Sequence, residues 1–480
     1  MPANPVVTDV TAVVERIRRA LGPAGVIEDP SAIAPYLVDF RGLYRGASPL
    51  VARPASTAEV SEVLAICHEH RIGVVPQGGN TGYCGGATPG DAGDQVVLSL
   101  ARLDRVREID TANHSMTVEA GCVLAAVQAA AADAGLYFPL SLGSEGSCQI
   151  GGNLSTNAGG LNAVRYGVAR DLTLGLEVVL PDGRVLDGLT SLRKDNTGYD
   201  LRDLFIGAEG TLGVITAASL KLFPAPRSVE TAFVAVAGPA AAVALLGRLR
   251  AESGDAVTSF EYLPRIALEF TVRHVPGVSD PLDRPHDCYV LCELSSPCED
   301  SGLRDALERG LAAALDDGLV LDAALAESLS QRAAMWKLRE SVPEGQRAEG
   351  ASIKHDVSVP IAALPAFMDE AAAAVAAIVP SGRLVAYGHV GDGNLHFNVS
   401  EPQGGDRAAF LAREHEIHAA VHGITRRYRG SISAEHGIGR LKRDDLALHE
   451  GPVAMDVMRA LKRALDPRGI MNPGKVLVVD

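Results

Sequence analysis

The sequence predicts an α+β protein with two main domains. At 480 residues the chain is longer than one ordinary hydrophobic core supports, so two or three domains are expected. Short β-type runs and amphipathic helical runs occur in both halves, which favours a mixed architecture over an all-helical or all-β one. Glycine-rich loops give way to regularly alternating strands and helices around Phe223–Pro226. This change places the domain boundary near residue 225.

The first half is expected to begin with an amphipathic helix over residues 9–21 that ends at Gly22. A strand, a helix opened by Ser56 or Thr57, and the short strand "IGVVP" then lead into a glycine loop. Later β-type runs are "VVLSL", "MTVEAG" and "LGLEVVLPDGRVL", with the helix "LAAVQAAAADAG" among them. The last run predicts a hairpin that turns at residues 181–183.

The second half alternates strands such as "TAFVAVAG" and "CYVLCELSS" with helices such as "PAAAVALLGRLRAES" and "GLRDALERGLAAALDDG". This pattern is typical of an α+β sandwich. The last forty residues return to helix and end in "MNPGKVLVVD". We therefore expect an N-terminal helical segment (1–48), a first domain (49–225), a second domain (226–440) and a returning C-terminal segment (441–480).

Composition excludes several classes of partner. The formal charge of -15, without a run of Lys or Arg, argues against nucleic acid but leaves room for an anionic substrate. Seven cysteines without a C-x-x-C pair suit a reducing cytoplasm and give no iron–sulfur or structural zinc spacing. Neither a signal peptide nor a charge-free apolar run of membrane-spanning length is recognised, so a cytoplasmic protein without a membrane span is expected.

Two glycine-rich loops, at residues 76–86 and 139–160, carry interleaved hydroxyl and amide side chains. Glycine lets backbone N–H groups approach a ligand closely, so the loops suit a pyrophosphate; simple tight turns are the alternative. No G-x-G-x-x-G leaves a strand, which argues against a Rossmann site. Residues 469–475 match G-x-x-x-x-G-K by accident, because Val476 stands where a P-loop needs Ser or Thr.

"PQGGNTG", "GSEGSCQIGGNLSTNAGG", "YGVARDLTLGLEVVLPDG" and "GAEGTLGVIT" together resemble the FAD-binding domain of the vanillyl-alcohol-oxidase/PCMH superfamily. The similarity is to the branch of D-lactate and D-2-hydroxyglutarate dehydrogenases and the glycolate oxidase flavoprotein subunit. The resemblance implies a PCMH-type FAD domain, a substrate (cap) domain with an antiparallel sheet, and a C-terminal segment that completes the FAD site. It assigns these residues to FAD: Pro76, Gly78, Gly79, Asn80, Thr81, Gly82, Pro139, Gly143, Ser144, Gly151, Gly152, Asn153, Ser155, Glu209, Gly213, Ile215 and Asn472.

Covalent attachment of flavin in the superfamily uses a His or Cys at particular loop positions. "QGGNTG" contains no His, so we expect non-covalent FAD, with Cys84 and Cys148 as the remaining candidates for a covalent link.

Two histidines flank the Asp392–Gly393 pair in "GHVGDGNLHFNV". If Asp392 and Gly393 are the central residues of a two-residue hairpin, His389 pairs directly with His396 on one face. Two neutral imidazoles so placed can hold one divalent metal ion, and a pair of ordinary buried or surface histidines is the alternative.

The resemblance adds Glu435 as a third metal ligand, with zinc as the metal, and His436 as a residue that contacts the substrate. "SISAEHGIGRLK" is expected to be a short strand ending in Glu435–His436, so that the two side chains point apart. A charged strand end is the alternative.

Arg339, on a helix, offers a guanidinium fork that suits a carboxylate, and Lys354 offers a second cation; a solvated surface charge is the alternative for each. The resemblance implies that both lie on the substrate side of the flavin. Asn398 and His436 complete this set of substrate-binding residues. Pro343 departs from the family, since a hydroxyl residue is common there in hydroxyglutarate-type relatives.

We therefore expect metal-assisted oxidation of a D-2-hydroxy acid to the 2-oxo acid, with hydride transfer to flavin N5 and His436 as the general base. Two cations favour D-2-hydroxyglutarate over D-lactate. An electron-transfer flavoprotein, a quinone or another acceptor would reoxidise FAD, and a homodimer is one expected assembly. An oxidase using oxygen, a catalytic subunit of a larger complex, and a metal-dependent hydrolase that binds a nucleotide are the alternatives.

Overall fold

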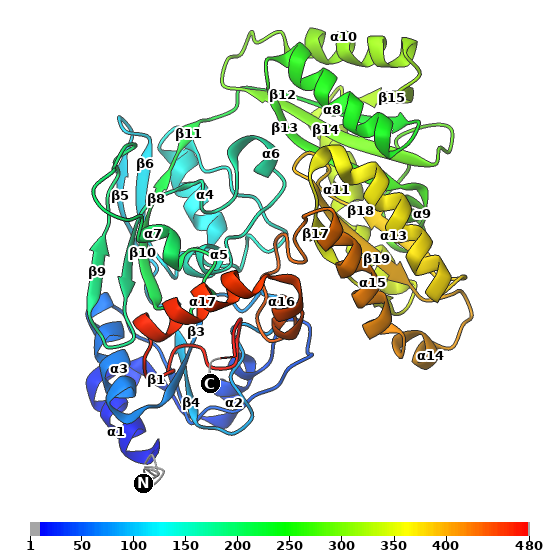
Figure 1. Cartoon of the computed structure of the whole chain (residues 1–480). Coiled ribbons are helices and arrows are strands. Elements are labelled where there is room, and N and C mark those ends of the chain that lie inside the picture. The colour runs from blue at the N-terminus through cyan, green and yellow to red at the C-terminus, as the bar shows by residue number, and fades with distance from the viewer. Residues whose placement is uncertain (1–9, 479–480) are drawn as a thin grey trace. The chain divides into compact units, whose positions relative to one another are not determined.

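The computed structural model describes residues 10–478, which form two compact units (Figure 1). The first unit contains the chain up to Gly159, Val168–Pro224 and the residues from Glu435; the second contains Gly160–Gly167 and Ala225–Ala434. The chain passes into the second unit briefly at Gly160–Gly167 and again after Pro224, beside the predicted boundary at residue 225. Its final return, after Ala434, precedes the predicted boundary at residue 440.

One sheet of the first unit has the strand order β1-β2-β4-β3, in which β2, β4 and β3 run parallel. Its strands are β1 (Val26–Ile27), β2 (Val51–Ala52), β3 (Gly73–Gln77) and β4 (Gln95–Ser99). The helices α1 (Val10–Leu21) and α3 (Thr57–His70) pack together, and α2 is Pro30–Ile33. Ser56 caps α3, since its side chain accepts a hydrogen bond from the Glu59 backbone N–H at 3.2 Å. The predicted helix start is confirmed.

The second sheet is antiparallel, with the order β5-β6-β10-β8-β9. Its strands are β5 (Val106–Asp110), β6 (Ser115–Glu119), β8 (Thr173–Val179), β9 (Val185–Gly188) and β10 (Val214–Lys221). Val179 pairs with Val185, so the hairpin predicted at residues 181–183 is confirmed. The unit also contains α4 (Leu124–Asp133), α5 (Ile150–Ser155), α7 (Arg202–Phe205), α16 (Arg443–His449), α17 (Pro452–Leu465) and the strand pair β7 (Leu136–Tyr137) and β11 (Phe223–Pro224).

The larger sheet of the second unit is buried on both faces, which explains its almost continuous apolar strands. Its order is β13-β14-β12-β15, with β12 at Ser228–Val236, β13 at Val257–Pro264, β14 at Cys288–Ser296 and β15 at Val320–Leu325. Residues such as Val234 face a core shared with α8 (Pro239–Ser253) and α10 (Leu303–Asp316). Their neighbours, such as Phe233, face α9 (Arg265–His274), α11 (Leu329–Glu340) and α12 (Val342–Ala348).

A smaller antiparallel sheet has β19 (Asn394–Ser400) at its centre, paired with β16 (Ser352–Ile353), β17 (Asp356–Ser358) and β18 (Arg383–Tyr387). The helices α13 (Leu364–Ile378) and α15 (Glu414–Arg427) pack together beside it, and α14 (Arg407–Leu411) precedes α15 (Figure 1). The short helix α6 (Ala163–Tyr166) also belongs to this unit and packs on β13.

One stretch of the described chain, residues 361–378, has the length and mean hydropathy of a membrane span. It contains Asp369 and Glu370, and its residues Leu364 and Phe367 are buried in the core of the second unit. Only 22% of the stretch is buried, and a single helix selected by length and composition is weak evidence for a membrane span.

Candidate active site

A cavity in the first unit is formed mainly by the loop after β3, the start of α5 and the segment that leads into β10. Its lining consists of Pro76, Gln77, Gly78, Gly79, Asn80, Thr81, Gly82, Cys84, Gly86, Ala87, Leu100, Gln149, Gly151, Gly152, Asn153, Ser155, Thr156, Glu209, Gly210, Gly213, Val214, Ile215 and His436. No Lys or Arg is among these described residues. Any anionic group in the cavity is therefore held by neutral donors, as the glycine loops predict.

Side-chain hydrogen bonds hold the loop after β3 in place. The Gln77 side-chain amide donates to the carbonyl oxygens of Tyr36 and Ala87 at 3.0 and 2.8 Å. Asn80 has a φ of 54° and donates to the Val38 carbonyl at 2.9 Å. A non-glycine residue in this left-handed region is uncommon and indicates that the surrounding contacts fix the loop.

The two glycine loops pack backbone against backbone at Gly79. A Cβ there would lie 2.1 Å from the Ser147 carbonyl oxygen, so only glycine allows this contact. The close approach expected at Gly79 is thus to the neighbouring loop. By contrast, a Cβ on Gly82 or Gly152 would meet nothing within 4 Å, and both residues line the cavity. These positions leave open space for a ligand.

Three buried side-chain atoms in this region have no hydrogen-bond partner among the described residues. They are Gln149 Oε1, Asn153 Nδ2 and Asn472 Oδ1. Buried polar atoms are normally paired, so a polar ligand or water is expected here. Neutral amides, exposed glycine backbone and an absence of cations together fit the diphosphate and flavin of FAD.

Most of the residues assigned to FAD by resemblance line the cavity. The exceptions are Pro139, Gly143, Ser144 and Asn472. Asn472 nevertheless supports the lining, because its Nδ2 donates to the carbonyl oxygens of Gly86 and Glu209 at 2.8 and 2.7 Å. Sequence reasoning overlooked Gln77 and Gln149, whose signal was a polar side chain beside each glycine loop.

Glu209 anchors the segment that carries His436. Its carboxylate accepts hydrogen bonds from the backbone N–H groups of Ile438 and Gly439 at 2.7 and 2.8 Å. Burial raises the pKa of the Glu209 carboxyl, while these two N–H donors oppose the rise. Glu209 also has a φ of 49°, which is unusual for this residue type. The strain is compensated by the two bonds, so Glu209 acts as a positioning residue.

The segment around His436 is not the strand that was expected. No strand is assigned between Ser431 and Lys442, and both Gly437 and Gly439 have positive φ. Bends at these glycines, held by the hydrogen bonds to Glu209, take the place of the expected strand. The His436 ring lies edge-on to Tyr83, with ring centroids 4.7 Å apart.

Glu435 lies beside Gly159, where an added Cβ would be 3.0 Å from Glu435 Oε1. The ligand atoms of Glu435 and His436 nevertheless lie within 4.8 Å of each other, so the prediction that the two side chains point apart is wrong. Because bends replace the expected strand, the alternation on which that prediction rested is absent.

In the second unit, the predicted register of the histidine hairpin is wrong. Tyr387, and not His389, pairs with His396, and the connection runs over residues 388–393. The His389 carbonyl accepts hydrogen bonds from three successive amides, those of residues 392–394. Gly388 pairs with Tyr262 of β13, which draws the chain out of the β18–β19 ladder. The two imidazoles still meet, with ring centroids 5.4 Å apart.

Glu261 connects His389 with Arg339, a role that sequence reasoning overlooked. Its carboxylate lies 2.5 Å from His389 Nδ1 and 2.5 Å from Arg339 Nε. Both partners are buried, and the Arg339 guanidinium also stacks 5.0 Å from the Tyr387 ring centre. Burial alone would raise the pKa of Glu261, but the charges of Arg339 and His389 outweigh it and lower the pKa to about 2. The carboxylate is therefore ionised at neutral pH.

A carboxylate behind Nδ1 of His389 fixes the ring orientation and increases the basicity of Nε2. This is the outer-shell contact typical of metal-bound histidines. His389, His396 and the Glu261 contact therefore fit a divalent ion that prefers imidazole ligands.

The remaining predicted substrate residues lie in different surroundings. Lys354 is exposed, between β16 and β17, whereas Asn398 is buried and donates to Gln346 Oε1 at 2.9 Å. Asp356, which sequence reasoning overlooked, pairs with His396 in the ladder and so lies on the same face of β19. Asn394 donates to the Asp356 carboxylate at 3.0 Å.

Two family models match the chain. The model described as "FAD binding domain" matches residues 48–188, and that described as "FAD linked oxidases, C-terminal domain" matches residues 225–476. The chain is 41% identical over 466 residues to a protein of Oryza sativa subsp. indica named probable D-2-hydroxyglutarate dehydrogenase, mitochondrial. That match covers 97% of this chain and 81% of the rice protein.

A protein of Bos taurus named D-2-hydroxyglutarate dehydrogenase, mitochondrial, is also 41% identical, over 480 residues, covering 99% of this chain and 85% of the relative. Among solved structures, p-cresol methylhydroxylase superposes with a TM-score of 0.77 at 18% identity, covering 97% of this chain and 96% of that one. This likeness confirms the predicted PCMH-type α+β fold.

Proposed function

The chain belongs to the family of FAD-linked oxidases, and we propose that it oxidises D-2-hydroxyglutarate, with D-lactate as the second candidate, to the 2-oxo acid. It is an FAD-dependent oxidoreductase, so the metal-dependent hydrolase alternative is wrong. The relatives' names support the dicarboxylate. The observation that carries the chemistry is the His389–Glu261–Arg339 arrangement beside His396.

FAD, when bound, supplies the acceptor for the hydride that leaves the substrate Cα. The cavity residues of the first unit would hold it through backbone N–H groups and the amides of Gln149 and Asn153, with Asn472 supporting the lining from behind. Attachment is non-covalent, because no histidine lies in the first glycine loop. Cys84 and Cys148 are both buried, and burial raises the pKa of the Cys148 thiol, which keeps it in the unreactive form.

The binding of FAD can be tested at Gly152, where a side chain would enter open cavity space. Gly152→Val is expected to purify with only trace FAD but with nearly unchanged thermal unfolding of the apoprotein, because an added Cβ there meets no protein atom within 4 Å. Gly146→Val is the matched control, since Gly146 lies outside the lining and also has open space around it. Flavin absorbance per chain is the measurement. A fully yellow Gly152→Val protein would remove this cavity as the flavin site.

A divalent ion, with zinc proposed, would supply Lewis acidity that lowers the pKa of the substrate hydroxyl. His389 and His396 are the proposed imidazole ligands, with His389 oriented by Glu261. Glu435 is proposed as the third ligand on the sequence resemblance. His436 accepts the hydroxyl proton as general base, and the backbone bonds made by Glu209 hold its segment in place.

Arg339 and Lys354 are proposed to bind the carboxylates of the substrate, with Asn398 nearby on β19. The ion pair with Glu261 neutralises part of the charge of the buried Arg339. Lys354 is exposed. A substrate with two carboxylates would use both Arg339 and Lys354. Pro343 lies in the first turn of α12, where it supplies no side-chain donor.

Stereochemistry provides the direct test of substrate class. Mixing the yellow enzyme anaerobically with D-2-hydroxyglutarate is expected to bleach the flavin absorbance in a stopped-flow instrument. D-Lactate should bleach it more slowly, and the L-enantiomers should leave it oxidised. Bleaching by L- but not D-hydroxy acids would overturn the assignment, and equal rates for the two D-acids would remove the preference for a dicarboxylate.

The electron acceptor separates the remaining alternatives. Rapid reoxidation of the reduced enzyme by oxygen would identify an oxidase, and slow reoxidation would favour an electron-transfer flavoprotein or a quinone. The cytoplasm stays the predicted compartment of this chain, although the rice and bovine relatives are named as mitochondrial.

A further inference from the structure

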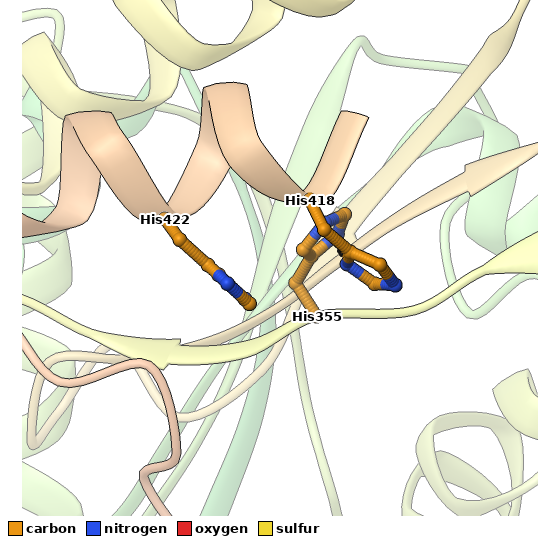
Figure 2. Close-up of side chains that lie close together, drawn as sticks. All are labelled: His355, His418 and His422. Atoms are coloured by element: carbon orange, nitrogen blue, oxygen red, sulfur yellow. Dashed lines mark hydrogen bonds between the residues drawn. The ribbon is translucent and has the colours of Figure 1, made fainter. Parts of the chain in front are cut away.

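Three histidines of the second unit take no part in the chemistry proposed above. His355 lies between β16 and β17, and His418 and His422 are four residues apart on α15, so their rings project from one side of the helix toward His355 (Figure 2). One nitrogen from each ring lies within 4.8 Å of the other two. The His355 ring centre lies 4.6 Å from that of His418 and 5.6 Å from that of His422.

The protonation of His355 is set by its surroundings. Its Nδ1 lies 2.7 Å from the carbonyl oxygen of Phe397, and a carbonyl only accepts, so Nδ1 carries the proton. In the neutral ring, Nε2 therefore keeps its lone pair and faces His418 Nδ1 at 2.9 Å. A backbone carbonyl behind the distal ring nitrogen is the contact that orients metal-bound histidines.

His418 has a comparable contact on its other nitrogen. Its Nε2 lies 3.5 Å from the Glu414 carboxylate, one helical turn earlier. His355 is only 2% exposed, whereas the His418 side chain is 27% exposed. The cluster is therefore anchored at its buried end and open to water at the other.

We propose that His355, His418 and His422 bind one divalent transition-metal ion, with zinc as the physiological choice, at a site distinct from His389 and His396. Zinc–nitrogen bonds of about 2.0–2.1 Å in a tetrahedral site place ligand nitrogens about 3.4 Å apart. The His355–His418 contact opens slightly on binding, and the partly buried His422 ring rotates inward. Water takes the fourth position. Imidazole ligands of this kind also bind Co²⁺, Ni²⁺ and Cu²⁺, which serve as probes.

The ion would fasten α15 to the sheet. Asp356 pairs with His396, so the preceding residue, His355, points to the opposite face of the sheet. Phe397, whose ring centroid lies 6.3 Å from that of His355, belongs to the same buried core as Ile417 and Val421 of α15. Binding there links helix and strands without contact with His396. Metal is expected to raise the thermal unfolding temperature of the whole chain, since an ion that binds only the folded state stabilises it.

The test uses the full-length, FAD-loaded protein, stripped of metal and carrying both His389→Ala and His396→Ala. These two substitutions remove the other candidate metal site. In a titration with Co²⁺, this protein is expected to bind one ion per chain. Binding should produce the visible absorption of nitrogen-ligated cobalt and an increase in unfolding temperature. Adding His418→Ala should abolish all three signals. His415→Ala is the matched control, because His415 lies on the same helix, is exposed, and should leave them unchanged.

A His389→Ala/His396→Ala protein that binds no Co²⁺ would overturn the second site while leaving the proposed oxidation intact. The same result follows if the His418→Ala addition still binds one ion. If His418→Ala fails to fold, His422→Asn on the partly exposed ring replaces it, and retained stoichiometric binding there would equally contradict the proposal. Loss of dehydrogenase activity alone bears on the other site and does not enter this test.

Discussion

His389→Ala and His396→Ala are each expected to lose one bound divalent ion and to lower turnover by more than about a hundredfold, because even outer-shell partners of a catalytic metal contribute about 10–100-fold. The double variant should be scarcely worse than either single one, since ligands of one ion act as a unit. The proposal of one shared ion rests on the closeness of the two rings, whose centroids are 5.4 Å apart. FAD content should stay unchanged, because the cavity residues belong to the first unit.

His436→Ala should behave differently from the ligand variants. We expect it to keep the ion and the FAD but to slow flavin reduction by about 10²–10⁴-fold, the usual contribution of a positioned general base. Metal analysis and stopped-flow reduction of the four variants are the measurements, with His415→Ala as a histidine control. Small, additive losses of stability with unchanged metal content would show that His389 and His396 are ordinary structural histidines.

The parts of the fold set by local chemistry were predictable from the sequence. Ser56 caps α3 because its hydroxyl lies one turn from an unpaired backbone N–H. Pro181–Gly183 turns the hairpin in which Val179 pairs with Val185, as its Pro-Asp-Gly sequence predicts. Both signals lie within a few residues of their effect. The cavity was also predictable from the sequence, because glycine loops with interleaved amide side chains are a local pattern that depends on few distant contacts.

The histidine loop was not predictable in this way, because distant contacts decide it. Asp392–Gly393 is a strong hairpin signal, but Gly388 pairs with Tyr262, and a Cβ on Gly393 would lie 2.3 Å from the Val359 carbonyl oxygen. The glycine is used for packing, and the turn moves. The two histidines still lie close together because the connection between β18 and β19 is short, even though they are not paired in the strand register.

Glu261 shows the same limit. A single carboxylate in the apolar strand "VTSFEYLP" is costly unless it is paired, so the sequence could have indicated a buried partner. It could not have identified Arg339, 78 residues away along the chain, or His389, 128 residues away. Such pairings depend on the arrangement of β13, α11 and the histidine loop.

Glu261→Gln is expected to lower the free energy of unfolding by about 3–5 kcal/mol at pH 7, the range for removing one partner of a buried ion pair. Arg339 would be left buried without its counter-charge, and the neutral amide holds His389 less firmly. The affinity for the divalent ion should also fall, by about 10–100-fold. Glu269→Gln is the control, since its exposed pair with Arg265 contributes less than about 1 kcal/mol.

The pH dependence of stability tests whether the carboxylate is ionised. The pKa of Glu261 is lowered from 4.5 to about 2 in the folded chain, so its contribution is fully present above pH 4.5 and is lost as the pH falls toward 2. The difference corresponds to about 3 kcal/mol, in line with the mutational range. Wild type and Glu261→Gln should therefore converge in stability across this window. Parallel curves would mean that Glu261 is already protonated in the folded protein.

A second variant separates stability from function. Glu261→Leu combined with Arg339→Met replaces the ion pair with apolar groups of similar size, and such replacements are often neutral or stabilising. We expect unfolding to return close to that of wild type while turnover stays low, because His389 still lacks the acceptor on Nδ1 and the substrate lacks Arg339. Recovery of turnover together with stability would assign Glu261 and Arg339 to folding alone. If neither stability nor turnover recovers, the charged pair is needed for the site to pack correctly. Measuring denaturation and flavin reduction on the same variant distinguishes the three results.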